Sequence, residues 1–231
     1  MSSRSAADSS AGIDRITTAL PLRHDHHYIV LSLMADWMRT VATKVARGVL
    51  LDYGCGGQPY RELFASRIER YIGADIAPAA NTAPDIVFAP SQPLPLPDAS
   101  VDTILSTQVL EHVADYQAYV EDCRRLLRQD GYLIITIPMH WRHHEMPTDY
   151  WRFTRYGIGH ALQQHAFGVE NLTPCGGVYA MLGQTFVDHL ANRGIGSKQV
   201  YGLVNRLALW LDRRIPDYDD TLGWMCLAKK L

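Results

Sequence analysis

The sequence has no apolar run that approaches the roughly 20 residues needed to cross a bilayer, so we expect no transmembrane segment. It also lacks a long basic stretch: the 22 lysines and arginines are scattered and the formal net charge is −2, which gives no reason to expect a nucleic-acid partner. The four cysteines show no paired spacing. This pattern is typical of a reduced, cytoplasmic protein rather than of a disulfide framework or a zinc knuckle.

Size and composition predict one globular domain. Residues 1–12 are small and polar, without the apolar segment of a signal peptide, and we interpret them as disordered. Residues 13–231 fit a single domain, because two full domains in this length would both be small. Hydrophobic residues make up 47% of the chain and charged residues 20%, as expected for a globular enzyme.

Short apolar runs alternate with helical patterns along the chain. Strands are predicted at 49–53, 71–75, 85–88, 101–106, 132–137, 169–172 and 223–228, and helices from Pro59 onward, at 115–128 and at 154–165, with a turn at 129–131. This alternation predicts an α/β fold with a doubly wound, largely parallel sheet. An amphipathic helix at about 26–45 precedes the first strand. A helical insertion at about 178–212 is expected to form a lid or an interface, such as that of a homodimer.

A glycine-rich turn follows the first predicted strand. The run Val49–Tyr53 carries Asp52 near its end and leads into Gly54-Cys55-Gly56, the kind of turn that holds a nucleotide-like ligand in an open α/β sheet. Asp75 ends the second apolar run 21 residues after Gly54, where a carboxylate can accept hydrogen bonds from a ribose diol. These residues predict an adenosine cofactor.

The same residues favour S-adenosylmethionine over a dinucleotide. A dinucleotide turn has a third glycine, and Pro59 stands in its place; Asp52 would also repel a pyrophosphate. S-adenosylmethionine has no phosphate and carries a sulfonium and an ammonium group that Asp52 can help to orient. A dinucleotide, or no ligand at all, stays open on the residues alone.

In several segments the chain resembles the class I S-adenosylmethionine-dependent methyltransferases of the type 11-like group. The matching segments are 51–56, 59–61, 73–76, 94–102, 108–113, 126–132 and the block Asp149-Tyr150-Trp151-Arg152-Phe153-Thr154. The resemblance implies a Rossmann-like, seven-stranded mixed sheet of order 3-2-1-4-5-7-6, with helices on both faces and the last strand antiparallel. It also implies S-adenosylmethionine as cofactor.

The resemblance assigns cofactor contacts by position. Gly54 and Gly56, with Cys55 between them, would line the methionyl part, and Asp75 would take the ribose hydroxyls. Ile76 would pack on the adenine, and Gln108 would lie beneath the cofactor near the methyl group. Many relatives place an acid after the third strand to hold the adenine amino group. Because this chain has Phe88-Ala89-Pro90 there, what holds that group stays open.

The chemistry of methyl transfer points to the segment after the fifth strand. An oxygen or nitrogen nucleophile that arrives protonated needs a base, and histidine is suited to this near neutral pH. We predict His144 as the base, with Asp149 orienting either this histidine or the substrate, and His112 as the competing base. The residues predicted to contact the acceptor are Tyr150, Arg152 and His140. Alternatively, Asp149 and Arg152 form an ion pair that only braces the loop.

These patterns predict transfer of a methyl group from S-adenosylmethionine to a small-molecule acceptor, such as a sugar or a natural-product hydroxyl or amine. The alternative is a non-catalytic S-adenosylmethionine-binding protein or partner subunit. The histidines at 24–27 and 140–144 suggest a metal, but their spacing matches no closed site, so we predict none. The sequence leaves open which acceptor atom is methylated.

Overall fold

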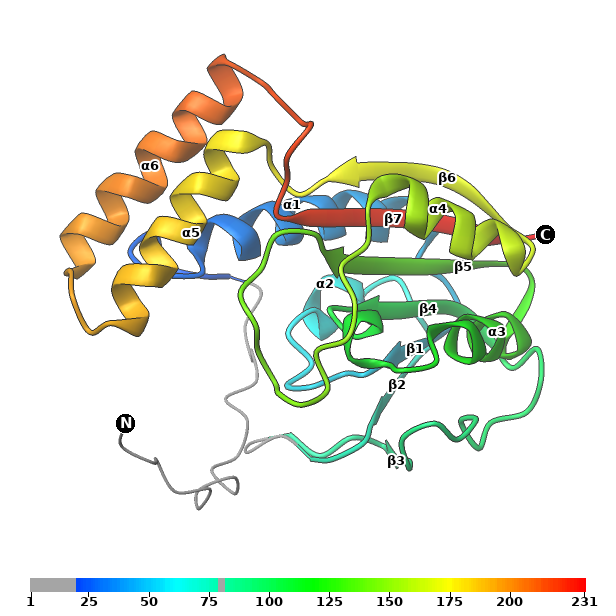
Figure 1. The fold of residues 1–231 in the computed structure, drawn as a ribbon. Helices are drawn as coiled ribbons and strands as arrows, with labels where there is room; N and C mark the ends of the chain where they lie inside the picture. The colour runs from blue at the N-terminus through cyan, green and yellow to red at the C-terminus, as the bar shows by residue number, and fades with distance from the viewer. Residues whose placement is uncertain (1–19, 79–81) are drawn as a thin grey trace.

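The computed structural model describes residues 20–78 and 82–231, so the segment 1–12 predicted to be disordered lies outside the described residues. Its centre is a seven-stranded sheet with the order β3-β2-β1-β4-β5-β7-β6 (Figure 1). The strands are β1 (Val49–Tyr53), β2 (Arg70–Asp75), β3 (Ile86–Val87), β4 (Val101–Thr107), β5 (Leu127–Pro138), β6 (Phe167–Pro174) and β7 (Gly223–Lys230). β7 pairs antiparallel with both β5 and β6, and the other neighbours pair parallel. The predicted strand order is confirmed.

Helices cover both faces of the sheet. Successive strand residues point to opposite sides, and in the central strands the residues on both sides are apolar. Leu50, Leu105 and Ile134 pack against α1 (Tyr28–Val45), α2 (Arg61–Phe64), α5 (Val178–Asn192) and α6 (Lys198–Arg214). Their neighbours Leu51, Ile104, Leu133 and Ile135 pack against α3 (Tyr116–Leu126) and α4 (Arg155–Gln164). Both faces of the central strands are therefore buried.

Two local predictions are corrected. The turn predicted at 129–131 lies within β5, which already pairs with β4 at Leu127; the register shifts between Val101 and Thr103, and Asp130 has a φ of 62°. The turn signal therefore marks a bulge. The helix predicted to start at Pro59 begins at Arg61 and lasts a single turn, because Pro59 belongs to the preceding turn.

The carboxyl ends of β1, β2, β4 and β5 lie at one edge of the sheet, as parallel pairing requires. In Figure 1 the antiparallel helices α5 and α6 stand beyond that edge, and the long loop from β5 to α4 passes in front of it. The fold thus surrounds this edge with the β1–α2 turn, the 139–154 loop and the α5–α6 pair.

Buried polar contacts hold α5 and α6 to the segment before and within α1. The Gln184 amide donates to the carbonyl of His26 at 2.6 Å, and its oxygen accepts from Val30 N at 3.2 Å. Asn205, which is fully buried, donates to the carbonyls of Arg23 and Asp25. α1, α5 and α6 therefore form a connected body beside the sheet edge. None of the helices in the described ranges is long and apolar enough to cross a membrane.

Candidate functional site

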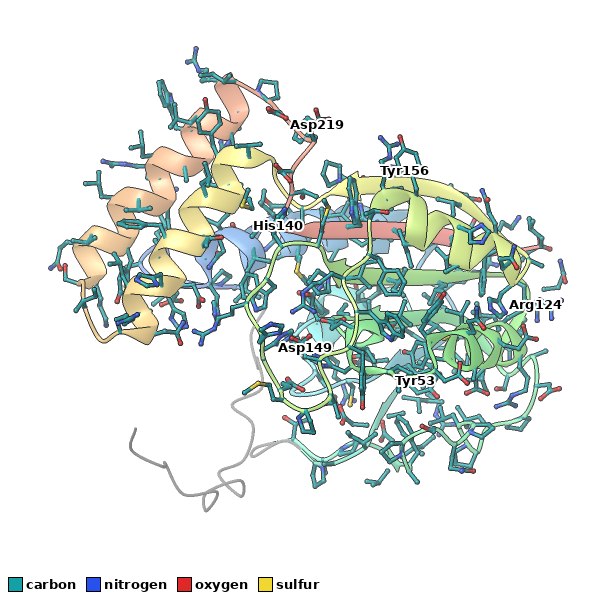
Figure 2. All side chains as sticks on the ribbon, viewed as in Figure 1. Tyr53, Arg124, His140, Asp149, Tyr156 and Asp219 are labelled. Atoms are coloured by element: carbon teal, nitrogen blue, oxygen red, sulfur yellow. The ribbon has the colours of Figure 1, made fainter. Side chains whose placement is uncertain are left out.

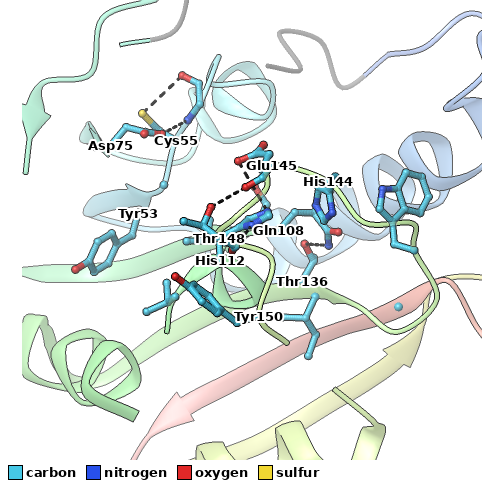
Figure 3. A pocket seen from close by; sticks show the side chains of 18 of the residues that line it. Tyr53, Cys55, Asp75, Gln108, His112, Thr136, His144, Glu145, Thr148 and Tyr150 are labelled. Carbon is cyan, nitrogen blue, oxygen red and sulfur yellow. Dashed lines mark hydrogen bonds and ion pairs between the residues drawn. The ribbon is translucent and has the colours of Figure 1, made fainter. Parts of the chain in front are cut away.

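A cavity of about 850 Å³ opens at the carboxyl edge of the sheet. Small-molecule sites span roughly 300–1,000 Å³, so the cavity has room for a nucleoside cofactor together with an acceptor. One end is lined by the turn after β1 and the residues after β2 and β3. The other end is lined by α1, α5 and the 139–154 loop. Figure 3 shows Asp75 and Cys55 on one side, and His112, Glu145 and His144 farther along.

The glycine turn exposes backbone to this cavity. Gly54 has a φ of 84°, and a Cβ there would stand 2.4 Å from a Val109 methyl group. Gly56 has a φ of 49°. The N–H groups of Gly54 and Cys55 both donate to the carbonyl of Ala74, which joins the turn to the end of β2. The backbone conformation therefore favours glycine at both positions, and at Gly54 the close approach of Val109 requires it as well.

Asp75 ends β2 and is brought next to the turn, as predicted. Its carboxylate accepts from Gly56 N at 2.8 Å and from Ala77 N at 3.3 Å, and the residue is 4% exposed while lining the cavity. The backbone contacts fix the carboxylate, and carboxylate oxygens can accept hydrogen bonds from a diol. The position is consistent with the predicted ribose contact, which stays a prediction.

Asp52 lies elsewhere than expected for a direct cofactor contact. It is 1% exposed, does not line the cavity, and accepts a hydrogen bond from the Tyr71 hydroxyl. Its other oxygen has no hydrogen-bond partner among the described residues. Burial raises the pKa of Asp52 to about 7, against the Tyr71 hydrogen bond, which lowers it. Asp52 can therefore act on a cofactor only through the turn that it underlies.

The adenine end is apolar. Ile76 is half exposed and lines the cavity, opposite the segment Phe88–Pro93. Tyr53 packs edge-on against Phe88, with ring centroids 5.3 Å apart. The polar side chains of Ser91 and Gln92 also line this end, and the sequence reasoning had not singled them out. Ser91 and Gln92 are therefore candidates for holding the adenine amino group, because they follow β3, where many relatives carry an acid.

Cys55, in the glycine turn, and Gln108, directly after β4, also line the cavity. Burial raises the pKa of the Cys55 thiol to about 12, so the thiol stays protonated and is no nucleophile at neutral pH. Gln108 has a φ of 54°; its backbone N–H donates to the Thr136 carbonyl and its side-chain amide to the Thr136 hydroxyl. These bonds fix Gln108 between β4 and β5.

A partly buried ion pair between Asp149 and Arg152 braces the loop 139–154. Arg152 donates to both carboxylate oxygens of Asp149, at 2.6 and 2.9 Å, and also to the carbonyls of Trp141 and Arg142. The Asp149 side chain is 3% exposed, and the Arg152 hydrogen bond holds its pKa well below the usual range. Neither residue lines the cavity. The geometry agrees with the alternative in which this pair braces the loop.

The two histidines predicted as alternative bases, His112 and His144, lie in contact with each other. The rings of His112 and His144 lie edge to face with centroids 4.7 Å apart, and both line the cavity. His144 Nδ1 lies 3.6 Å from Asp149 Oδ2, so Asp149 is near the histidine it was predicted to orient. Burial, followed by the neighbouring His112, lowers the pKa of His144, which favours the neutral, proton-accepting imidazole.

Glu111 stands behind this histidine pair, and its importance was missed. It is fully buried, and neither carboxylate oxygen has a hydrogen-bond partner in the described part of the chain. Its Oε1 lies 3.9 Å from His112 Nε2 and 4.0 Å from His144 Nε2. Burial raises the pKa of Glu111 to about 8. The available signal was an acid directly before His112, past the end of β4.

Of the three residues predicted to contact the acceptor, only Tyr150 lines the cavity. Tyr150 lines the cavity and is about half exposed, whereas Arg152 is engaged with Asp149. His140 points to Asp220, with Nε2 3.0 Å from its carboxylate, and does not line the cavity. In Figure 2 His140 lies near the start of β7, apart from Asp149. The individual residues that α5 and the start of α1 contribute were not predicted: His27 Nε2 lies 3.4 Å from Asp188, and both line the acceptor end.

The strand order and the glycine turn after β1 match the Rossmann-like methyltransferase fold. More particularly, residues 51–135 match the family model described as a methyltransferase domain. A probable S-adenosylmethionine-dependent methyltransferase of Mycolicibacterium smegmatis is 32% identical over 137 residues, which is 53% of each chain. A ubiquinone biosynthesis O-methyltransferase of Cereibacter sphaeroides is 33% identical over 127 residues, covering 49% of this chain and 51% of its own.

The chain therefore spans about half the length of these curated relatives. Among solved structures, the fold is shared by the 1,6-didemethyltoxoflavin-N1-methyltransferase of Burkholderia thailandensis. That structure contains 1,6-didemethyltoxoflavin and S-adenosylhomocysteine; it has a TM-score of 0.54 and 16% identity, and the match covers 98% of both chains. At this identity the likeness concerns the fold.

Proposed function

We propose that the protein transfers a methyl group from S-adenosylmethionine to a small-molecule acceptor. One observation carries the proposal: a single cavity joins the Gly54–Gly56 turn and Asp75 to the His112–His144 pair. A nucleoside held by the first set presents its methyl group toward the second. Relatives named as O- and N-methyltransferases support the reaction class and leave the acceptor atom undecided.

The reaction is an in-line displacement at carbon. A lone pair on the acceptor oxygen or nitrogen forms a bond to the methyl carbon while the carbon–sulfur bond breaks. The electron pair goes to sulfur, and S-adenosylhomocysteine leaves. The cofactor supplies the electrophile, and the protein supplies alignment. In this proposal His144, whose side chain lines the cavity, accepts the acceptor proton at Nε2, and Tyr150 contacts the acceptor.

The acceptor end favours a small polar molecule. His27, Arg142 and Asp188 form a charged cluster there, with Arg142 3.6 Å and His27 3.4 Å from the Asp188 carboxylate. Trp141 supplies an aromatic face next to His27. An acceptor with several hydroxyl or amine groups, such as a sugar or a natural product, fits this mixture of polar and aromatic groups.

Calorimetry with S-adenosylmethionine and S-adenosylhomocysteine tests the cofactor, and a donor-consumption screen over hydroxyl and amine acceptors tests turnover. We expect both nucleosides to bind with one equivalent and NADH not to bind. Absence of binding by either nucleoside would overturn the proposal. Binding together with no turnover across the screen would favour a non-catalytic binding protein or partner subunit.

Two further features of the whole protein belong to this proposal. The exposed apolar side chains of α5 and α6 support a homodimer through these helices. They include Leu182, Phe186, Leu203, Leu207 and Trp210. A cytoplasmic location is supported by four cysteines that are all buried and unpaired.

A further inference from the structure

The side chains of Glu111, His112 and His144 converge beside the cavity, where the two histidines line its acceptor end and Glu111 is buried behind them. They come from two separate segments, the short helix η1 (Leu110–His112) after β4 and the 139–154 loop. One ligand-type atom from each residue lies within 4.8 Å of the other two. Figure 3 shows His112 and His144 on the same side of the cavity as Glu145. The cluster is thus assembled by the fold and not by sequence spacing.

Glu111 is the unexplained member of the cluster. Both of its oxygens are buried, and neither accepts a hydrogen bond from the described residues. The positive charge of Arg152 acts to lower the pKa of Glu111, but its guanidinium donates to Asp149. A buried carboxylate is normally paired, hydrogen-bonded or bound to a metal. The atoms that Glu111 Oε1 faces are the Nε2 atoms of the two histidines, at 3.9 and 4.0 Å.

The imidazole of His112 is oriented as metal ligands usually are. His112 Nδ1 lies 3.0 Å from the Thr148 carbonyl, and this contact fixes the tautomer with Nδ1 protonated and Nε2 free. Ligating histidines typically donate their second ring nitrogen to a carbonyl or carboxylate in this way. His144 Nδ1 lies 3.6 Å from Asp149 Oδ2 and has no hydrogen-bond partner among the described residues. The Nε2 lone pair of His112 is then available beside Glu111.

We propose that Glu111, His112 and His144 bind a divalent first-row transition metal ion at the acceptor end of the cavity. Two histidines and one carboxylate are a common ligand set for such ions, and they leave coordination positions open. Ligand atoms about 2 Å from one ion stand at most about 4 Å apart, so the ion would draw the three side chains slightly together. Glu145 Oε2, 4.0 Å from His112 Nε2, is in reach as a further ligand.

The metal site rests on the proposed function in one respect. The open coordination positions of the ion would take an oxygen atom of the methyl acceptor. A metal-bound hydroxyl is more acidic than a free one. The histidines would then act as ligands, and His144 would not take the proton at Nε2. The two roles exclude each other at that atom, so metal binding also decides between them.

The test uses the full chain after treatment with a chelator. Titration with Zn²⁺ is followed by calorimetry, and titration with Co²⁺ by its visible absorption. We expect about one equivalent of either ion and a Co²⁺ spectrum typical of nitrogen and oxygen ligands. Wild-type protein that takes up neither ion would overturn the proposal.

Variants locate the ion. Glu111→Gln keeps the size of the side chain and His144→Ala removes a loop ligand; each is expected to weaken Zn²⁺ binding at least about tenfold, the loss that even outer-shell changes cause. His143→Ala is the matched control, because His143 is adjacent, 87% exposed and outside the cluster. Thermal melting without metal checks that each variant folds. Undiminished binding in both Glu111→Gln and His144→Ala would overturn the proposal.

A second histidine cluster in the same cavity is an informative competitor. His26, His27 and Asp188 also place three ligand atoms within 4.8 Å of one another. If His27→Ala removes the ion and His144→Ala does not, the proposed site is wrong. S-adenosylmethionine binding is measured on the same samples. Nucleoside binding without metal binding refutes the metal site alone, whereas metal binding without nucleoside binding refutes the proposed function alone.

Discussion

At the scale of single residues, Asp75 joins the cofactor end of the cavity to the glycine turn. Asp75→Ala removes both a candidate ribose acceptor and the acceptor of the Gly56 N–H. We expect S-adenosylmethionine affinity to fall by roughly 1–3 kcal/mol, the cost of a lost charged hydrogen-bonding partner. Calorimetry measures the loss, and the melting temperature separates it from general destabilisation.

The control for Asp75→Ala is Asp85→Ala. Asp85 also accepts a hydrogen bond from a backbone N–H, that of Gly73 at 2.8 Å, but does not line the cavity. It should therefore cost stability without reducing cofactor affinity. Equal loss of affinity in the two variants would show that the effect of Asp75 is structural.

Asp52 gives a pH-dependent prediction. Its pKa is about 7 in the fold and ordinarily 3.8. Between these values the native carboxyl keeps a proton that the unfolded chain has released, so wild-type stability falls as pH rises through this window. Asp52→Asn cannot titrate. Its free energy of unfolding relative to wild type should rise from pH 4 to pH 7, by an amount on the order of a few kcal/mol.

Urea unfolding at pH 5 and pH 8 measures that difference. A stability difference between Asp52→Asn and wild type that stays constant with pH would show that Asp52 is ionised in the fold at both values. Cofactor affinity of the same variant separates two roles of this acid. Unchanged affinity would make Asp52 a structural support of the turn, and reduced affinity would restore the charge-based role predicted from the sequence.

At the scale of elements, the Asp149–Arg152 pair governs the 139–154 loop. Arg152→Ala leaves a carboxylate that is 3% exposed without its main partner, which should cost roughly 3 kcal/mol. Because the loop supplies His144 and Tyr150 to the acceptor end, turnover should fall while S-adenosylmethionine affinity is largely retained. Steady-state kinetics and calorimetry on one preparation compare the two.

Arg155→Ala is a suitable control for Arg152→Ala, since Arg155 is exposed, lies three residues farther along and contacts Tyr156 and Trp224 instead. A variant of Arg152 with normal turnover would show that the loop keeps its shape without the pair. A parallel loss of cofactor affinity would mean that the pair supports the whole edge of the sheet.

Most of the elements were predictable because their signals are local. The apolar runs around Leu50, Ile104 and Ile134 define central strands buried on both faces, and Thr154 marks the start of α4, where its side chain accepts from Gly157 N. The bulge at Asp130 was misread because a left-handed residue before a glycine has the same sequence signature in a turn and in a bulge.

The sequence identified more of the residues that line the glycine-turn end of the cavity than of those at the opposite end, for a similar reason. Gly54, Gly56 and Asp75 follow strands whose order fixes where they meet. The acceptor end joins residues far apart in the chain, such as His27 and Asp188, through the packing of α1 on α5. Neither periodicity nor spacing encodes that contact. Glu111 was overlooked because its unpaired burial exists only once His112 and His144 have folded around it.

At the scale of the whole molecule, the outer face of α6 predicts self-association. Leu203 and Leu207 are one turn apart, Trp210 follows on the same stripe, and these side chains are 58%, 52% and 53% exposed. On the inner face, Asn205, Ala208 and Asp212 are buried and hold the helix in place. The apolar stripe thus contributes little to the fold of one chain, which leaves association as its best-supported use.

If two copies pack through this stripe, Leu203→Asp combined with Leu207→Asp should convert a dimer to a monomer. Each partner would then have to bury two carboxylates in an apolar contact. Sedimentation velocity over a range of concentrations measures the mass, and Arg206→Asp, an exposed change between these positions, is the control. Because both substituted side chains are exposed, melting temperature should change little. A wild-type protein that sediments as a monomer at all concentrations contradicts the dimer, and the apolar stripe then needs another partner.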